Sequence, residues 1–388
     1  MIETPFDKLF NKVVDNRGKT CPTSSTGTPL IATNCIKNDQ LYPVFERVRY
    51  VDDATMKNWF RGHPKPGNIL FVTKGTPGRV AWVPDPVTFC IAQDMLALDV
   101  NDRIIYPKYL FAVLRSSNTQ GEIENLHVGS LIPHFKKGDF NRLSIPTPDR
   151  KIQEFIGDLY FNSCLKIDLL HRNNRTLEDM AEALFRQWFV EDADESWVTG
   201  KLTDLIELNP KRSLARGSIS PYLEMSNLSN EVYHPTNWYD REFTSGTKFI
   251  NGDTLLARIT PCLENGKTAF VDFLDKDQVG WGSTEYIVMR TKSGVHPFFA
   301  YVLARDSDFR AFAIGSMVGS SGRQRVDVGN ISTYEMVIPP VDVVGRFNDF
   351  INPILERMKK SNNEIRTLSE LRDILLPKLM SGEVSVNL

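Results

Sequence analysis

The sequence predicts an α+β chain in which two homologous domains of mixed strands and helices are separated by two long antiparallel helices. The helices are expected to form a coiled coil with pseudo-twofold symmetry. Three observations predict this fold. The chain repeats itself once, each copy is followed by a long stretch with few prolines, and both stretches carry the same heptad seam. At 388 residues the chain also exceeds what one hydrophobic core usually organises.

The internal repeat has an offset of about half the chain length. Short runs rich in Val, Ile and Phe, bounded by Gly and Pro, predict strands joined by turns, with one helix near 107–116 or 297–306. The start of the second copy, 197–210, is matched only loosely by 6–16 in the first copy. The paired landmarks, in the same order in both copies, are Pro29 and Pro221, 67–72 and 252–257, Thr76 and Thr260, 78–83 and 266–271, Pro107 and Pro297, and Ile145 and Ile338.

A long helix is predicted after each copy because seam residues recur at alternating steps of four and three. The seam of the first helix comprises Ile156, Tyr160, Ser163, Ile167, Leu170, Asn174, Leu177, Ala181, Leu184 and Trp188. Adding 191 to each number gives the second seam, from Phe347 to Leu379. Pro353 is expected to kink the second helix or mark its start, and Pro377 to end or bend it. A core helix of an ordinary domain is the alternative interpretation of each seam.

These patterns divide the chain into five segments. A helix of roughly 35 to 40 residues would be on the order of 50 to 60 Å long. Because B-DNA repeats about every 34 to 36 Å, a rod of this length suits two half-sites separated by unread base pairs. The segments are a first domain at 1–148, a first helix at 149–191, a second domain at 192–341, a second helix at 342–381 and a tail at 382–388.

Composition restricts the class of function only loosely. The net charge of −2 argues against binding nucleic acid by bulk electrostatics. Residues 1–150 nevertheless contain 19 Lys and Arg against 15 Asp and Glu. Five scattered cysteines without a CxxC pair are expected to be reduced thiols, and no metal site is predicted. No apolar run could span a bilayer and no signal peptide is recognisable, so a cytoplasmic location without a membrane partner is expected.

Basic or amide side chains in glycine-bounded loops are the candidates for contact with DNA, because Lys and Arg bind phosphates while Arg and Gln read bases. A solvated surface charge is the alternative for each residue. The candidates of the first copy are Lys74, Arg79, Ser130, His134, Lys136 and Lys137. Those of the second copy are Arg258, Lys267, Ser320, Arg323, Gln324 and Arg325.

Catalytic interpretations fail on residue spacing. The segments 266–268 and 18–20 mimic the end of a phosphate-binding loop, but Pro261 and Val13 stand where that loop needs glycine. The sequence also contains no Asn/Asp-Pro-Pro-aromatic methyltransferase motif and no recognisable carboxylate cluster of a metal-dependent nuclease. We therefore expect no catalytic residues in this chain.

Three motifs resemble those of Type I restriction-modification specificity subunits. They are the Gly-Asp-x-Leu-Leu-x-Arg segment at 252–258, the apolar Ile-Pro element before each helix, and the tail at 371–383. The resemblance covers essentially the whole chain. It implies a non-catalytic subunit whose two target-recognition domains bind an asymmetric bipartite site in double-stranded DNA.

The resemblance also implies partner subunits. Two modification subunits would carry S-adenosylmethionine and methylate adenine, and restriction subunits that use ATP and magnesium could join them. No cofactor is expected on this chain itself. A coiled-coil adaptor that binds only protein is the alternative function. Apolar residues beside the seams are candidates for binding partners, with intrachain packing as the alternative, and these are Phe155, Leu159, Leu169, Phe185, Phe350 and Leu371.

Overall fold

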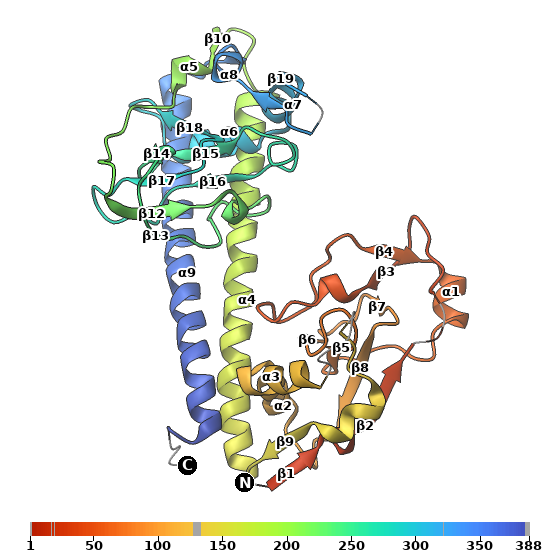
Figure 1. Ribbon diagram of the computed structural model, residues 1–388. Coiled ribbons are helices and arrows are strands. Elements are labelled where there is room, and N and C mark those ends of the chain that lie inside the picture. The colour runs from red at the N-terminus through yellow and green to blue at the C-terminus, as the bar shows by residue number, and fades with distance from the viewer. Residues whose placement is uncertain (1, 17, 19, 127–132, 321, 385–388) are drawn as a thin grey trace. The chain divides into compact units, whose positions relative to one another are not determined.

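The computed structural model describes residues 2–16, 18, 20–126, 133–320 and 322–384 (Figure 1). The chain forms two compact units. Unit 1 contains residues 1–169 and 365–388, and unit 2 contains residues 170–364. Each unit therefore combines one strand-rich domain with part of each long helix.

Unit 1 contains two main sheets and a short strand pair. The four-stranded sheet has the order β2-β8-β5-β6 and the three-stranded sheet the order β4-β3-β7, while β1 pairs with β9. The strands are β1 (Ile2–Pro5), β2 (Phe10–Asp15), β3 (Thr28–Ile31), β4 (Arg49–Val51), β5 (Ile69–Val72), β6 (Val80–Trp82), β7 (Cys90–Ile91), β8 (Met95–Val100) and β9 (Ser144–Thr147). The helices are α1 (Asp53–Asn58), α2 (Pro107–Arg115), α3 (Ser117–Asn125) and the beginning of α4 (Arg150–Arg186).

Unit 2 repeats this topology. Its sheets have the orders β11-β18-β15-β16 and β13-β12-β17-β14, with a short pair between β10 and β21 and a hairpin of β19 and β20. The strands are β10 (Thr199–Lys201), β11 (Ile206–Leu208), β12 (Ile219–Leu223), β13 (Tyr239–Glu242), β14 (Thr247–Phe249), β15 (Thr254–Ala257), β16 (Thr268–Phe270), β17 (Gly280–Gly282), β18 (Tyr286–Thr291), β19 (Met317–Val318), β20 (Arg325–Val326) and β21 (Glu335–Val337). The helices are α5 (Leu202–Leu205), α6 (Phe298–Arg305), α7 (Ser307–Gly315), α8 (Val328–Ser332) and α9 (Val341–Ser381).

The structural repeat is more complete than the sequence repeat. Strands β1 and β2 begin the first domain as β10 and β11 begin the second, and each first strand pairs with the strand that closes its domain. The parallel pairing of β3 with β7 recurs as β12 with β17. The start of the first copy therefore has an equivalent pair of strands, with β1 just before 6–16 and β2 within it.

Helices α2 and α6 confirm the predicted helix of each copy. Pro107 occupies the first turn of α2, where its missing N–H costs no hydrogen bond. The caps that separate the following helices are also equivalent. The Ser116 side chain accepts from Thr119 N at the start of α3, and the Asp306 side chain accepts from Phe309 N at the start of α7. Both copies thus use a side-chain cap to begin a second helix directly after the first.

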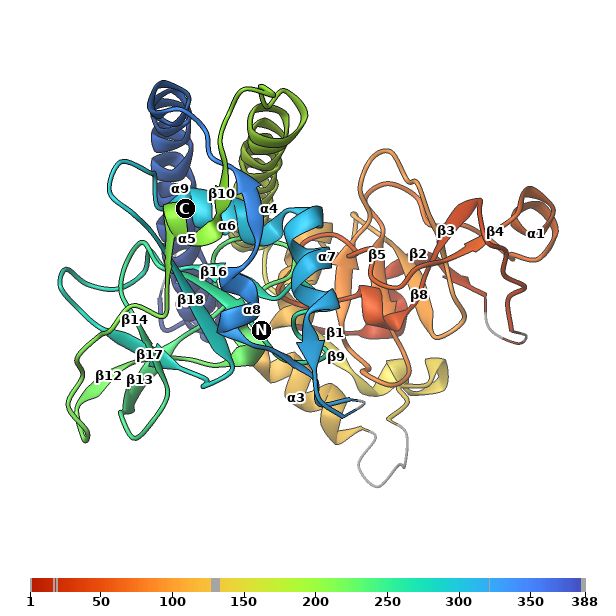
Figure 2. The ribbon, with the colours of Figure 1, turned by 90° about the horizontal axis from the view of Figure 1, so that it is seen from above.

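The long helices α4 and α9 pack against each other through the predicted seams. In unit 2 the two helices lie side by side (Figure 1, Figure 2). There the rings of Trp188 and Phe347 lie 6.5 Å apart, and Asn174 Nδ2 donates to Asn362 Oδ1 at 2.8 Å. In unit 1, Arg372 Nη1 lies 3.9 Å from Cys164 Sγ. Residue numbers rise along one helix as they fall along the other, so the helices run antiparallel. The two strand-rich domains and two packed helices predicted from the sequence are confirmed.

The two prolines of α9 have less effect on its ends than the sequence suggested. The helix begins at Val341 and ends at Ser381, so neither Pro353 nor Pro377 marks an end, and that part of the prediction was wrong. Both prolines are exposed. Water can therefore reach the backbone carbonyls that lose a helical donor at these positions.

A buried network of hydrogen bonds joins α4, α6 and α9 in unit 2. Glu178 of α4 accepts from the Tyr301 hydroxyl of α6 and, at 3.0 Å, from Tyr233 N. The Tyr233 hydroxyl accepts from Asn362 Nδ2 of α9 at 2.8 Å, and Asn362 is bonded to Asn174. Burial raises the pKa of Glu178 to about 7. The second domain is thus attached to its helices by polar contacts as well as by apolar packing.

We predict that Glu178 makes the stability of the protein depend on pH. Its pKa is about 7 in the folded chain and about 4.5 when unfolded, so the stabilisation is complete below pH 4.5 and is lost as the pH rises through 7. The free energy of unfolding should fall by about 3 kcal/mol as the pH rises, and Glu178→Gln should abolish this pH dependence. Urea unfolding at pH 5 and pH 7 measures the effect. The control, Asp179→Asn, changes an exposed neighbour, and equal pH dependence in all three proteins would contradict the prediction.

Candidate nucleic-acid interface

Three strands bring most of the predicted DNA-binding residues of the second domain together. Arg258 follows β15, and its backbone N donates to Glu285 O at 3.0 Å, next to β18. On the other side, Val326 N of β20 donates to Arg258 O at 3.0 Å, and Thr260 N donates to Gln324 O at the same distance. The segment after β15 is therefore held between the start of β18 and the hairpin of β19 and β20.

The hairpin, residues 317–326, presents an exposed polar tip. Ser320 and Arg323 are exposed, and Arg323 N donates to Ser320 O at 3.0 Å. Gly319 has φ +130°, and a Cβ there would lie 3.0 Å from Arg323 O, so this turn requires glycine. No ion pair is recorded for Arg323 in the part of the chain that the structure describes. Its guanidinium is available to a phosphate.

Arg325 is instead paired with a carboxylate that sequence reasoning missed. Its Nε lies 2.9 Å from both Glu285 oxygens, and its Nη2 lies 2.8 Å from Oε1. Hydrogen bonding to Glu285 raises the pKa of Arg325 above its ordinary value. Arg258 has a looser partner, because its Nη2 lies 3.8 Å from Asp327 Oδ2. Two of the predicted arginines therefore have carboxylates beside them.

Lys267 makes contacts that are structural. Its Nζ donates to Met225 O at 3.0 Å and to Ser226 O at 3.3 Å. These carbonyls belong to a short 3-10 segment after β12, Met225–Asn227. Two of the three ammonium hydrogens are thus directed at the backbone, and Lys267 holds this turn against the strand that follows Gly266.

The first domain has the same backbone arrangement with different side chains. Thr73 N donates to Asp94 O at 2.9 Å, Phe135 N donates to Thr73 O at 2.8 Å, and Gly75 N donates to Pro133 O at 3.0 Å. These bonds match those of the second domain one by one. The equivalent pairs are Thr73 and Arg258, Asp94 and Glu285, His134 and Arg325, and Lys74 and Ile259.

The remaining candidates of the first domain are distributed around this arrangement. Lys74 is exposed and forms a backbone bridge with His134. Arg79 occupies the position of Lys267, because Val72 N donates to Arg79 O as Ala257 N donates to Lys267 O. Lys136 and Lys137 are both exposed where the 3-10 segment Lys137–Arg142 begins. Ser130 lies outside the described residues.

A face of the helix pair in unit 1 is apolar and exposed. We call it the apolar stripe, and its residues lie at heptad positions c and g. In an antiparallel pair the g positions of both helices flank the same side of the seam, so these residues share one face. The stripe consists of Phe155, Leu159, Leu169, Leu371 and Ile374, which are 38% to 58% exposed. Ile374 was not among the sequence candidates.

Two other candidates for partner binding on the helices pack against residues of the chain itself. Phe185 is only 2% exposed and packs in the core of unit 2, where its ring lies 5.0 Å from that of Phe299. It is at heptad position e, on the side that the second domain covers, so its side chain is not accessible to a partner. Phe350 is half-buried, with its ring 6.4 Å from that of Trp188.

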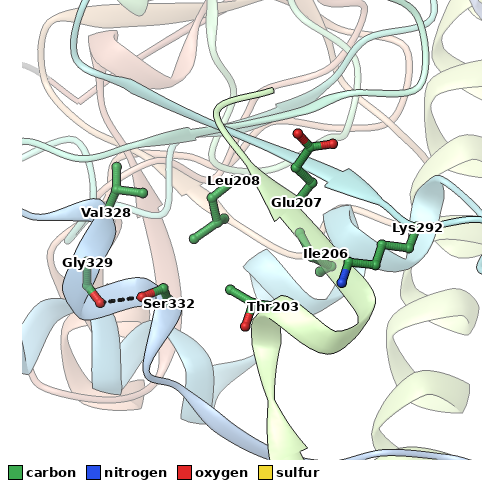
Figure 3. A pocket seen from close by; sticks show the side chains of 8 residues that line it. All are labelled: Thr203, Ile206, Glu207, Leu208, Lys292, Val328, Gly329 and Ser332. Atoms are coloured by element: carbon green, nitrogen blue, oxygen red, sulfur yellow. Dashed lines mark hydrogen bonds between the residues drawn. The ribbon is translucent and has the colours of Figure 1, made fainter. Parts of the chain in front are cut away.

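A shallow pocket in unit 2 lies outside these surfaces. Its polar side chains include Glu207 and Lys292, which carry opposite charges, and the Ser332 hydroxyl donates to Gly329 O at 2.6 Å (Figure 3). None of the predicted DNA-binding residues lines it. The lining residues are Thr203, Ile206, Glu207, Leu208, Lys292, Val328, Gly329 and Ser332.

Two features are absent from the residues that the structure describes. No group of three or more His, Cys, Asp or Glu side chains could hold a metal ion. No helix among these residues is both long enough and apolar enough to cross a membrane.

Comparison with known proteins finds similarity to Type I restriction-modification specificity subunits. A model of the Type I restriction modification DNA specificity domain matches residues 17–179. The chain is 21% identical to the Type I restriction enzyme MjaIX specificity subunit of Methanocaldococcus jannaschii, covering 92% of this chain and 87% of that protein. The chain belongs to the family of Type I restriction-modification specificity subunits.

Two further similarities extend over most of this specificity subunit. The HindI specificity subunit of Haemophilus influenzae is 22% identical, covering 82% of this chain and 87% of that protein. The crystal structure of a Type I S subunit from M. genitalium has a TM-score of 0.56 at 14% identity, covering 97% of this chain and 95% of that chain. That structure supports the fold, with its strand-rich domains and long helices.

We predict that Lys267 supports the fold of the second domain. Lys267→Met removes two hydrogen bonds from an ammonium to backbone carbonyls, so the free energy of unfolding should fall by about 1 to 3 kcal/mol. Lys276→Met is the matched control, because Lys276 is exposed. Thermal unfolding of both variants measures the difference. Equal stability of the two variants would show that the Lys267 hydrogen bonds do not stabilise the fold.

Proposed function

We propose that this chain reads DNA sequence for a Type I restriction-modification complex and that each domain reads a different half of an asymmetric bipartite site. One observation carries the proposal. The two domains hold equivalent loops by the same backbone hydrogen bonds, yet place Arg258, Glu285 and Arg325 in one loop set where the other has Thr73, Asp94 and His134. A shared scaffold that carries different side chains suits two related readers of different sequences.

The chemistry of the complex is proposed to belong to its partners. Two modification subunits would supply S-adenosylmethionine and adenine methylation, and restriction subunits would supply ATP hydrolysis with magnesium. The chain described here would supply the sequence information. The distance between the half-sites remains a prediction from the lengths of α4 and α9, which contain 37 and 41 residues.

The apolar stripe of unit 1 is proposed to bind helices of a modification subunit. It exposes apolar side chains on one face of a helix pair whose other face is covered by the first domain, through Phe161 and Cys164. An amphipathic partner helix could extend this pair into a bundle by adding its own apolar face.

Salt-dependent binding to duplex DNA tests the proposed function. A complex of this chain with its modification subunits should bind one bipartite sequence more tightly than others, and the affinity should fall linearly with the logarithm of salt concentration. Lys136→Ala combined with Lys137→Ala should reduce that slope by about 2, because each exposed lysine releases about one counterion. Lys151→Ala, an exposed residue of α4, is the control. A complex without sequence preference or salt dependence would favour the adaptor function.

We predict that charge in the apolar stripe prevents assembly. Leu371→Glu combined with Ile374→Glu should weaken binding of the modification subunit at least about tenfold, because a packed interface would bury both carboxylates. The melting temperature of the chain itself should change little, since both positions are about half exposed. Arg366→Glu, at an exposed position on another face of α9, is the control. Assembly measured by titration should be normal for the control, and normal assembly of the double variant would contradict the proposal.

A further inference from the structure

We propose that Arg325 reads a guanine in the half-site bound by the second domain and that Glu285 is the positioning residue that aims it. This inference rests on the proposed function and makes it specific. It assigns one base contact to one side chain. It also gives a role to a carboxylate that would otherwise only weaken DNA binding.

The geometry of the pair leaves the reading edge of the arginine available. The Glu285 carboxylate takes Nε–H and one hydrogen of Nη2, at 2.8 to 2.9 Å. A guanidinium has five N–H donors, so two on Nη1 and one on Nη2 remain. Among the residues that the structure describes, no contact to Nη1 is recorded. Guanine offers O6 and N7 in the major groove, which accept two parallel hydrogen bonds from such an edge.

The backbone of Glu285 is itself fixed by two hydrogen bonds. Its N–H donates to Ser283 Oγ at 3.1 Å, and its carbonyl accepts from Arg258 N at 3.0 Å. Its side chain is 23% exposed and that of Arg325 is 45% exposed. The carboxylate therefore restrains the arginine while the guanidinium remains accessible to solvent, which lowers the entropy lost when a base is bound.

The charge of the pair favours a base over a phosphate. Together the two side chains carry no net charge, and a phosphate at Arg325 would lie close to the Glu285 carboxylate. A base edge is neutral and avoids this repulsion. Arg323, two residues earlier and without a recorded ion pair among the described residues, is the better phosphate ligand. The hairpin thus combines one residue suited to affinity with one suited to specificity.

The first domain should read a different base at the equivalent position. Its backbone places His134 where Arg325 lies and Asp94 where Glu285 lies. Histidine lacks the parallel donors of a guanidinium. The proposal therefore predicts guanine recognition by this position in one half-site only.

Selection from randomised duplexes by the complex of this chain with its modification subunits tests the inference. The wild-type complex should select a guanine at one position. Arg325→Ala and Arg325→Lys should both lose this preference, with discrimination against other bases reduced roughly 5- to 150-fold. Glu285→Ala should reduce the same discrimination by a smaller factor. Arg323→Ala should lower affinity for all sequences without changing the selected bases, and His134→Ala should change the other half-site only. Thermal unfolding of each variant checks that it is folded.

The possible results separate the inference from the proposed function. If the wild-type complex selects no sequence, the proposed function fails and the inference fails with it. If the wild-type complex selects a bipartite site and both Arg325 variants select the same site, the inference alone is overturned. If the Arg325 variants lose guanine while Glu285→Ala discriminates as well as the wild type, the positioning role of Glu285 is overturned.

Discussion

The seam between α4 and α9 is the constraint on which the rest of the structure depends. Each helix must bury one stripe of apolar side chains along its length, and each does so against the other helix running in the opposite direction. Because the seam residues occupy heptad positions a and d, the seam also fixes which side of the helix pair each remaining heptad position faces. In unit 1 the first domain covers the side that contains Phe161, whereas the side that contains Leu159 and Leu371 is left open, and in unit 2 the second domain covers Phe185. The attachment of the domains and the proposed partner surface both follow from this one choice.

Polar residues make the packing in unit 2 specific. Asn174 occupies a seam position where an apolar residue would stabilise the helix pair more. Its hydrogen bond to Asn362 links the two helices in one register. Asn362 also donates to the Tyr233 hydroxyl, and the Tyr233 backbone N–H donates to Glu178. The second domain therefore satisfies these hydrogen-bonding groups in one arrangement. Apolar packing alone would tolerate small shifts between domain and helices. A base-reading surface needs a fixed position, and this network provides one within unit 2.

Much of this fold could be predicted from the sequence because its signals are local or repeated. The heptad seam identified both helices, and the repeat identified both strand-rich domains. The remaining features depend on contacts between residues distant in sequence. Glu285 is 40 residues from Arg325, and nothing in the local sequence marks them as partners. Lys267 has the same charge as Arg323, but only the fold shows that its ammonium meets two carbonyls. Phe185 and Leu159 are both apolar residues beside the seam, and only the placement of a domain distinguishes them.

The central claim is that each domain carries its own reading surface on a common scaffold. The most direct test replaces the first domain with a second copy of the second domain and determines the methylated sequence of the assembled complex. The account predicts that the bipartite site becomes a palindrome made of two copies of one half-site, while the natural chain directs methylation to an asymmetric site. An unchanged asymmetric site in a complex that still assembles would contradict the claim, because the replaced domain would then contribute no sequence information.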